Sequence, residues 1–329
     1  MSTEQSLYPL KFTPILKERI WGGDRLHTVL GKKTKTDHCG ESWELSGVSG
    51  DISVVENGFL KNNNLQELIE IYMGDLVGDT IYDKFGIEFP VLIKFIDAQD
   101  DLSIQVHPDD QLAAERHNSY GKTEMWYVME ADKDSNLIVG FNQKMDKTTY
   151  LRALDEKKLK DIMNVEKVSK GDVFFIPAGR IHAICKDILV AEIQQTSDVT
   201  YRIYDWDRID SDGKSRELHT ELAVDAIDYS YHDHYKTQYR KKEQGTAELV
   251  KCPYFTTNII SISQSMEKDY QAIDSFVIYI CTSGSCSIEY GPGKITDIRK
   301  GETILLPAVL KNIRLIPSEP TEILEVFID

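Results

Sequence analysis

The sequence predicts a mainly β protein, an antiparallel sandwich or barrel with a few helical segments. Three observations support this prediction: many short runs rich in β-branched and aromatic residues, turn residues between those runs, and a segment that occurs twice. The clearest strand-like runs are 89–96, 125–129, 136–140, 173–176 and 188–193. Gly, Asp, Asn and Lys separate them, as is typical of turns between antiparallel strands.

Helical patterns are fewer than strand patterns. Apolar residues recur at helical spacing in segments 64–72, 109–117, 149–163 and 220–227. We therefore expect helices in these segments, inserted between strands.

A weak internal repeat indicates two related units. Segment 170–178 (Lys-Gly-Asp-Val-Phe-Phe-Ile-Pro-Ala) is similar to segment 300–308 (Lys-Gly-Glu-Thr-Ile-Leu-Leu-Pro-Ala), and each reads as a turn, a strand and a proline corner. A hairpin-like apolar stretch precedes each copy. We expect a first unit over 1–235 and a second over 246–329. The polar and charged segment 229–244 between them is typical of a linker.

Composition narrows the possible function classes. With 329 residues, 41% hydrophobic and 28% charged, the chain is an ordinary globular one, and no apolar run approaches the roughly 20 residues of a membrane span. A net charge of −16 disfavours nucleic-acid binding. Residues 1–6 show no signal-peptide pattern, so we expect a cytoplasmic protein. The five scattered cysteines predict neither a disulfide framework nor a zinc knuckle.

Three separated motifs supply potential metal ligands. They are Ser-Ile-Gln-Val-His-Pro-Asp, Lys-Thr-Glu and Pro-Ala-Gly-Arg-Ile-His-Ala, and the ligands in them are Gln105, His107, Glu124 and His182. Because residues two apart in a strand share a face, Gln105 and His107 can point into one cavity. Two imidazoles, a carboxylate and an amide oxygen suit Zn²⁺, and also Mn²⁺, Fe²⁺ or Co²⁺.

Two other parts of the chain offer fewer signs of a metal site. The second unit has Asn312 where the first has His182, and no histidine follows His234, so we expect no metal there. His232 and His234 have metal-ligand spacing, but they lie in the polar segment without a strand pattern, which favours a solvated loop.

The order of the three motifs resembles that of cupins, and specifically of type I mannose-6-phosphate isomerases. Segments 10–14, 21–23, 40–44 and 190–208 extend the resemblance over most of residues 8–210, while the second unit is similar only to a degenerate cupin. The short spacing between Glu124 and Pro177 is similar to that of the short bacterial form.

The resemblance has definite implications. It implies two cupin-like jelly-roll barrels, the first with a metal site and the second without one. It implies one Zn²⁺ per chain, bound by Gln105, His107, Glu124 and His182. It also implies an aldose–ketose isomerase that interconverts mannose 6-phosphate and fructose 6-phosphate.

Such an isomerisation moves a proton between C2 and C1 while negative charge gathers on the adjoining oxygens, so it needs a cation and a base. Glu192 shares a strand face with Gln194 and matches a pocket carboxylate of the family; the alternative is a hydrogen-bonded barrel residue. Lys122 shares a face with Glu124 and is the rival proton shuttle; the alternative is an exposed turn lysine.

The remaining candidates are mainly cationic. Arg202, placed by the family match, would brace an enediolate or a phosphate bidentately. Ser103, on the face of Gln105, and Arg208, at a basic position of the larger relatives, are the phosphate candidates. Weaker basic candidates are Lys94, Arg19 and Arg180, and we expect Trp21 to be a core residue.

Two other functions also fit parts of the pattern. Two histidines and a carboxylate match the facial triad of non-haem iron oxygenases, although Gln105 and the Arg202/Arg208 pair argue against that reading. A non-catalytic sugar-binding cupin is the other alternative, and the intact ligand set of the first unit disfavours it. We expect a small phosphosugar partner, and no nucleic acid or membrane. The oligomeric state is not predicted.

Overall fold

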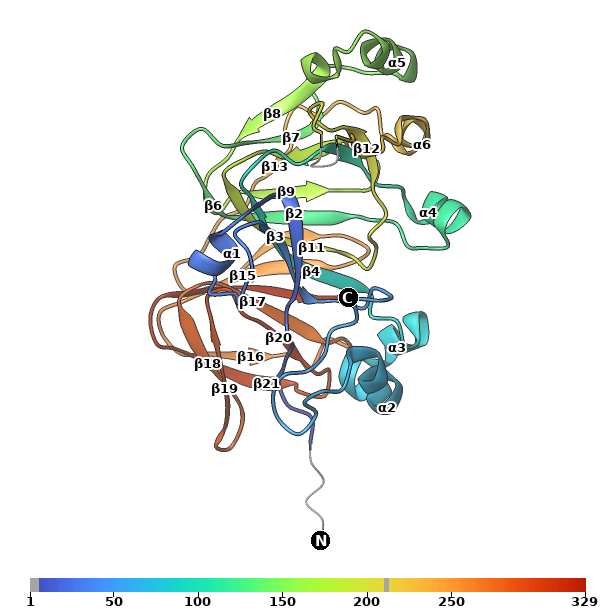
Figure 1. Ribbon diagram of the computed structural model, residues 1–329. Helices are drawn as coiled ribbons and strands as arrows, with labels where there is room; N and C mark the ends of the chain where they lie inside the picture. The colour runs from blue at the N-terminus through green and yellow to red at the C-terminus, as the bar shows by residue number, and fades with distance from the viewer. Residues whose placement is uncertain (1–5, 210–212) are drawn as a thin grey trace.

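The computed structural model describes residues 6–209 and 213–329 and confirms the mainly β fold class (Figure 1). Within these residues the antiparallel strands form four sheets. The five-stranded sheet has the order β12 (Tyr201–Tyr204), β5 (Ile104–Val106), β10 (His182–Ile184), β7 (Asn136–Phe141), β8 (Met163–Lys167). The seven-stranded sheet has the order β13 (Lys236–Thr237), β9 (Val173–Ile176), β6 (Glu124–Ala131), β11 (Ile188–Gln195), β4 (Val91–Ala98), β2 (Ile15–Gly23), β3 (Cys39–Leu45).

The other two sheets come mainly from the C-terminal part of the chain. The six-stranded sheet has the order β1 (Leu10–Lys11), β20 (Thr303–Leu306), β17 (Val277–Ser283), β22 (Thr321–Phe327), β15 (Thr256–Ile262), β14 (Gly245–Lys251). The four-stranded sheet has the order β16 (Met266–Asp269), β21 (Asn312–Pro317), β18 (Ser285–Gly291), β19 (Lys294–Arg299). The N-terminal strand β1 thus pairs with β20, far away in sequence.

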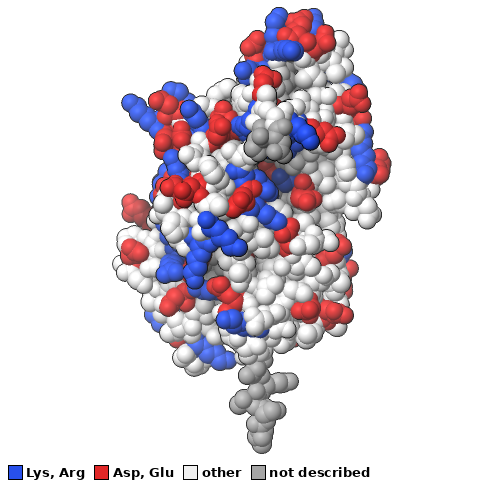
Figure 2. All heavy atoms as spheres, viewed as in Figure 1, with Lys and Arg blue, Asp and Glu red and all other residues white. Residues whose placement is uncertain are grey.

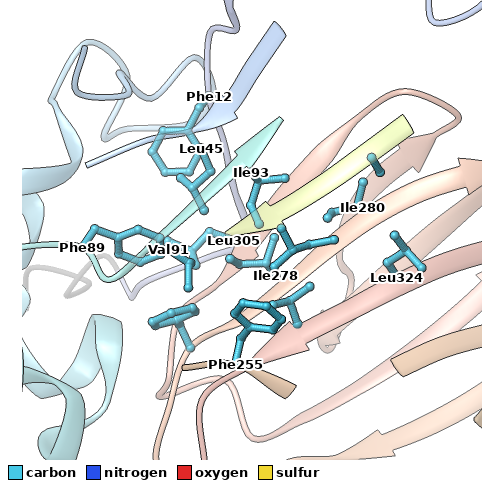
Figure 3. Packing of buried hydrophobic residues seen from close by; sticks show 14 of the residues in the cluster. Phe12, Leu45, Phe89, Val91, Ile93, Phe255, Ile278, Ile280, Leu305 and Leu324 are labelled. Carbon is cyan, nitrogen blue, oxygen red and sulfur yellow. The ribbon is translucent and has the colours of Figure 1, made fainter. Parts of the chain in front are cut away.

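The seven-stranded sheet is buried on both faces, with one core on each side. In β6, Trp126 and Val128 join the core toward the five-stranded sheet, whereas Met125 and Tyr127 join the core toward the six-stranded sheet. The alternation follows from the period of two in a strand. The second of these cores, shown in Figure 3, joins residues of both units, such as Ile93 and Ile278. A further core fills the space between the six- and four-stranded sheets.

The repeat is confirmed at the level of individual hydrogen bonds. The glycines of the two copies, Gly171 and Gly301, both have positive φ, 90° and 84°. Their amides donate to Val128 and Cys281, in the equivalent strands β6 and β17, at 2.8 and 2.9 Å. A left-handed turn of this kind favours glycine.

The hairpins predicted before each copy are wrong. Strands β6 and β7 belong to different sheets, as do β17 and β18. In both units the chain therefore crosses from one sheet of the sandwich to the other. A crossing of this kind and a hairpin have the same local pattern of apolar residues, so the sequence does not distinguish them.

The expected helices are present, with one shorter than predicted. The helices are α1 (Arg25–Thr28), α2 (Leu65–Val77), α3 (Asp79–Phe85), α4 (Asp110–His117), α5 (Lys147–Asp155) and α6 (Thr220–Ala226). The helix predicted over 149–163 ends at Asp155, because Lys157 has positive φ and Met163 already pairs with Phe141 as β8 begins. Figure 1 shows α4, α5 and α6 on one side of the upper half. None of the helices in the described ranges has the length and apolar character of a membrane span.

The polar segment 229–244 packs against the first unit more closely than a linker would. It supplies β13, which pairs with β9, and the buried Tyr235, whose hydroxyl donates to the carbonyl of Phe141 at 2.9 Å. His232 contacts Arg180 at 3.1 Å and belongs to no candidate metal cluster among the described residues.

Candidate metal and substrate site

Three predicted ligands meet between the two sheets of the first unit. His107, Glu124 and His182 are buried, and their ligand atoms all lie within 4.8 Å of one another. Strand register brings them together, because His182 of β10 pairs directly with Gln105 of β5, two residues before His107. Glu124, the first residue of β6, comes from the facing sheet.

Both imidazoles are oriented as metal ligands would be. The Nδ1 atom of His107 contacts the carbonyl oxygen of Val199 at 3.0 Å, and that of His182 contacts the carbonyl of Arg180 at 2.8 Å. A carbonyl accepts only, so Nδ1 carries the proton and Nε2 carries the lone pair that a metal would use. The Nε2 atoms lie 3.5 and 3.4 Å from the two oxygens of Glu124. Burial lowers the pKa of both rings, that of His107 to about 3, so both are neutral.

Glu124 provides the test of whether a cation fits. Its side chain is fully buried, and neither carboxylate oxygen has a hydrogen bond of good geometry. A buried carboxylate without such bonds is costly unless a cation compensates it. The ammonium group of Lys122 lies 3.0 Å from Glu124 Oε2 and 3.0 Å from His107 Nε2. A positive charge therefore already stands where a metal ion would compensate the carboxylate. The residues therefore fit a divalent cation held between two imidazole lone pairs and a carboxylate.

Gln105 extends the set. Its side-chain amide lies 3.3 Å from His182 Nε2. The two ends of an amide have nearly the same shape, so a rotation of the group presents the oxygen to a cation at the same place. Gln105 is also the strand partner of Arg202 on β12, which brings that arginine next to the ligand set.

The segment before His182 needs glycine. Gly179 has φ of +88°, and a Cβ there would lie 2.9 Å from the carbonyl oxygen of Ala226. Its amide donates to the carbonyl of His107 at 2.9 Å. The Pro-Ala-Gly motif thus joins the segment that carries the ligand His182 to the ligand His107.

A cavity of about 360 Å³ adjoins the ligand cluster. Of the residues predicted for the site, it is lined by Ser103, Gln105, Lys122, Glu192 and Arg202. Gln105 and Lys122 touch both the cavity and the ligand cluster. Lys122 is only 5% exposed, so the exposed-turn alternative is wrong. Burial alone would lower the pKa of Lys122, but Glu124 and Glu192 outweigh it and raise that pKa.

Glu192 lies on the wall of this cavity and is held on two sides. Its Oε2 accepts a hydrogen bond from Trp126 Nε1 at 2.8 Å, and its Oε1 lies 3.3 Å from Lys94 Nζ. Burial, reinforced by the negative charge of Glu124, raises the pKa of Glu192. A buried carboxyl with a raised pKa is suited to take or give a proton near neutral pH.

Comparison with known proteins places this chain in a family. The model of the type I phosphomannose isomerase catalytic domain matches residues 9–138. Mannose-6-phosphate isomerase ManA of Bacillus subtilis is 36% identical over 96% of both chains, and the mannose-6-phosphate isomerase of Streptococcus mutans is 35% identical over 92% of this chain and 94% of its own. The chain belongs to the mannose-6-phosphate isomerase family. The resemblance inferred from the motifs is confirmed.

Solved structures agree with this family assignment. The crystal structure of the Bacillus subtilis mannose 6-phosphate isomerase superimposes with a TM-score of 0.87 at 33% identity, covering 98% of this chain and 99% of that one. A putative mannosephosphate isomerase of Archaeoglobus fulgidus, at 20% identity and a TM-score of 0.78, shares the fold. The cupin-like fold class is thereby confirmed.

The cationic wall differs from the one predicted. Arg208 does not line the cavity in the described residues; it donates to the carbonyl of Asp101 at 2.6 Å and lies 3.7 Å from Asp205. Arg216 lines the cavity instead and pairs with both oxygens of Asp205 at 2.7 and 2.5 Å. Arg202 lines it too, donates to the carbonyl of Glu217 at 2.9 Å and has an unpartnered, buried Nε.

The cavity has further lining residues that the sequence indicated weakly or not at all. Arg19, Lys94 and the 5% exposed Trp21 line the cavity, whereas Arg180 does not. Sequence reasoning missed Glu41, Trp43, Asp198, Thr200 and Arg216. Glu41 and Trp43 are two apart in β3, and that shared strand face could have indicated them. Arg216 lies outside any strand and carried no comparable signal.

Proposed function

We propose that this chain interconverts mannose 6-phosphate and fructose 6-phosphate. The observation that carries the proposal is the buried His107, Glu124 and His182 cluster beside a cavity with both acidic and basic walls. Relatives that match nearly the whole chain are named mannose-6-phosphate isomerases. We propose that the substrate is a small phosphosugar and that the enzyme acts in the cytoplasm.

The four residues Gln105, His107, Glu124 and His182 would hold one divalent ion, for which Zn²⁺ is our proposal. When bound, it would stabilise the negative charge that develops on the sugar oxygens. The donor set supports this assignment, because both imidazoles are neutral and the carboxylate oxygens lack hydrogen bonds.

Two residues of the cavity could move the proton between C1 and C2. Glu192 has a raised pKa, and Trp126 and Lys94 fix its position. Lys122 is the alternative and lies within 3.0 Å of the ligand carboxylate. In both cases the side chain lines the cavity that would hold the sugar.

Cations on the wall would orient the rest of the substrate. Arg202, with its unpartnered Nε, would brace the enediolate or the phosphate. For the phosphate itself we propose Ser103, which lines the cavity, and Arg208, which lies 3.7 Å from Asp205. Arg216 pairs with the same carboxylate on the cavity side and is a second basic candidate. Acidic and basic side chains are interspersed on the face in Figure 2, so an anion meets no uniformly negative surface there.

An isomerase assay tests the proposal. We expect the metal-loaded protein to convert mannose 6-phosphate to fructose 6-phosphate without consuming oxygen. A chelator should abolish this activity, and a divalent metal should restore it. Glu124→Ala should lose metal and activity while its circular dichroism spectrum stays unchanged. Oxygen consumption would favour the oxygenase, and binding of the sugar phosphate without turnover would favour a sugar-binding protein.

The proton shuttle is tested separately by the pH dependence of kcat. If Glu192 is the base, Glu192→Gln should abolish the acidic limb of the profile, while Lys122→Met should leave that limb in place. The opposite result, in which only Lys122→Met changes the limbs of the profile, would assign the proton transfer to the lysine.

A further inference from the structure

We propose that Tyr254, in the second unit, positions the segment that carries Lys122 and Glu124 through a chain of hydrogen bonds formed by Asp110 and Gln195. The inference rests on the proposed function of that segment. It gives the second unit, which carries no metal-ligand cluster among its described residues, a defined part in the reaction.

The chain begins in the loop between β14 and β15. Tyr254 donates its hydroxyl hydrogen to Asp110 Oδ2 at 2.7 Å. The next residue, Phe255, is 1% exposed in the core that joins the two units, so the loop has a fixed anchor. Asp110 is the first residue of α4 and follows closely on the ligand His107.

The other carboxylate oxygen of Asp110 accepts hydrogen bonds from the first unit. Its Oδ1 accepts hydrogen bonds from Gln195 Nε2 and from the amide of Gly121, both at 2.9 Å. Gly121 approaches so closely that a Cβ there would lie 2.6 Å from the amide nitrogen of Asp110. Partial burial would raise the pKa of Asp110, but these hydrogen bonds lower it, so the carboxylate stays ionised. One charged group thus receives three donors from three parts of the chain.

Gln195 completes the connection. Gln195 is 4% exposed. Its side-chain Oε1 accepts a hydrogen bond from the backbone amide of Thr123 at 2.8 Å, and its backbone amide donates to the carbonyl of Thr123 at 3.1 Å. The backbone of Thr123 is therefore held on both sides. Because Thr123 lies between Lys122 and Glu124, its position sets where those two side chains enter the site.

Positioning of this kind affects the rate more than the fold. A reacting group misplaced by about 1 Å can cost roughly a hundredfold in rate, while the loss of one exposed hydrogen bond hardly affects stability. The Tyr254 to Asp110 bond lies at the surface, so its removal leaves no buried polar group unpaired.

Tyr254→Phe tests the proposal because it removes only the hydroxyl. We expect kcat to fall about fivefold with KM changed less than about twofold, as for the loss of one positioning hydrogen bond. Metal content and melting temperature should stay as in the wild type. Asp110→Ala should lower kcat further, and Asp110→Asn, which keeps an acceptor oxygen, should recover part of the loss.

Tyr239→Phe is the matched control. Its hydroxyl also contacts the first unit, donating to the carbonyl of Gly171 at 2.7 Å, but Gly171 bonds to β6 at Val128, four residues beyond Glu124, and not at Thr123. We expect kcat of this variant to equal that of the wild type.

Hydrogen exchange gives a second readout that does not depend on activity. The Thr123 amide should exchange faster in Tyr254→Phe and Asp110→Ala than in the wild type and in Tyr239→Phe. Unchanged exchange and unchanged kcat in Tyr254→Phe would overturn the proposal, as would equal losses in the control. If the wild type were no isomerase, the exchange result alone would still decide whether the chain of contacts exists.

Discussion

Glu124 determines the electrostatics around it at the scale of single residues. Its buried carboxylate faces two neutral imidazoles and Lys122, and the positive charge of Lys122 holds its pKa well below the usual range despite burial. Burial raises the pKa of Glu192, and the negative charge of the nearby Glu124 raises it further. Lys122 thus keeps Glu124 ionised, and burial together with that negative charge leaves Glu192 ready to accept a proton.

The two arginines around Asp205 give a test at this scale. We expect Arg216→Gln to raise KM for the sugar phosphate about tenfold, because a hydrogen bond from a charged donor to an anion is worth about 1.5–3 kcal/mol. Arg208→Gln changes the other arginine at Asp205. Because that side chain does not line the cavity in the described residues, we expect it to act on the phosphate through Asp205 and Arg216 and to raise KM less. Steady-state kinetics decide. A large change in KM in Arg208→Gln alone would assign the phosphate to Arg208.

The metal cluster was predictable from sequence because strand alternation and motif order determine it. Gln105 and His107 share a face by spacing, and register then brings His182 beside Gln105. The cationic wall was not predictable in the same way. Arg216 reaches the cavity from an irregular segment, where no periodicity indicates the direction of a side chain.

At the scale of elements, the long buried strands β4, β6 and β11 were identified because they are rich in β-branched and aromatic residues. Sequence patterns did not show which strands cross between sheets, since a crossing and a hairpin have the same local pattern. The helix predicted over 149–163 is wrong beyond Asp155 for a related reason, because the strand pairing of Met163 with Phe141 overrides the helical spacing of apolar residues.

Asp97 of β4 gives a prediction about stability. It is 1% exposed; Oδ2 accepts the amide of Arg25 at the start of α1 at 2.7 Å, and Oδ1 has no partner. Burial raises its pKa from 3.8 to about 6. The folded protein therefore binds this proton more tightly than the unfolded chain, and stability falls as the pH rises from about 4 to about 6.

Asp97→Asn removes the ionisation and keeps an acceptor for Arg25. We expect the free energy of unfolding at pH 7 to rise by about 1 kcal/mol, and the gain to disappear near pH 4. Urea unfolding at the two pH values measures this difference. A gain that is the same at both pH values would show that ionisation of Asp97 is not its cause.

At the scale of the whole molecule, the two units share a core. The core between the seven- and six-stranded sheets contains Ile93 from one unit and Ile278 from the other (Figure 3). Strand β1 of the first unit also pairs with β20 of the second. The division into 1–235 and 246–329 stays a prediction. With so much apolar surface shared between the sheets, we expect the two units to unfold as one.

Ile278→Ala tests this cooperativity. The side chain is fully buried, so truncation should destabilise the protein by about 2–5 kcal/mol. Calorimetry should show a single transition, shifted to lower temperature, with equal van't Hoff and calorimetric enthalpies. Two transitions, of which only one moves, would mean that the units are independent.

The central claim is that the side chains of His107, Glu124 and His182, with Gln105, bind one divalent ion beside the substrate cavity. Anomalous diffraction from crystals of the active, zinc-loaded protein at the zinc edge tests it most directly. We expect one strong peak, about 2.0–2.2 Å from both Nε2 atoms and from a Glu124 oxygen. A peak at His232 and His234 instead, or full activity without a peak at the cluster, would contradict the claim.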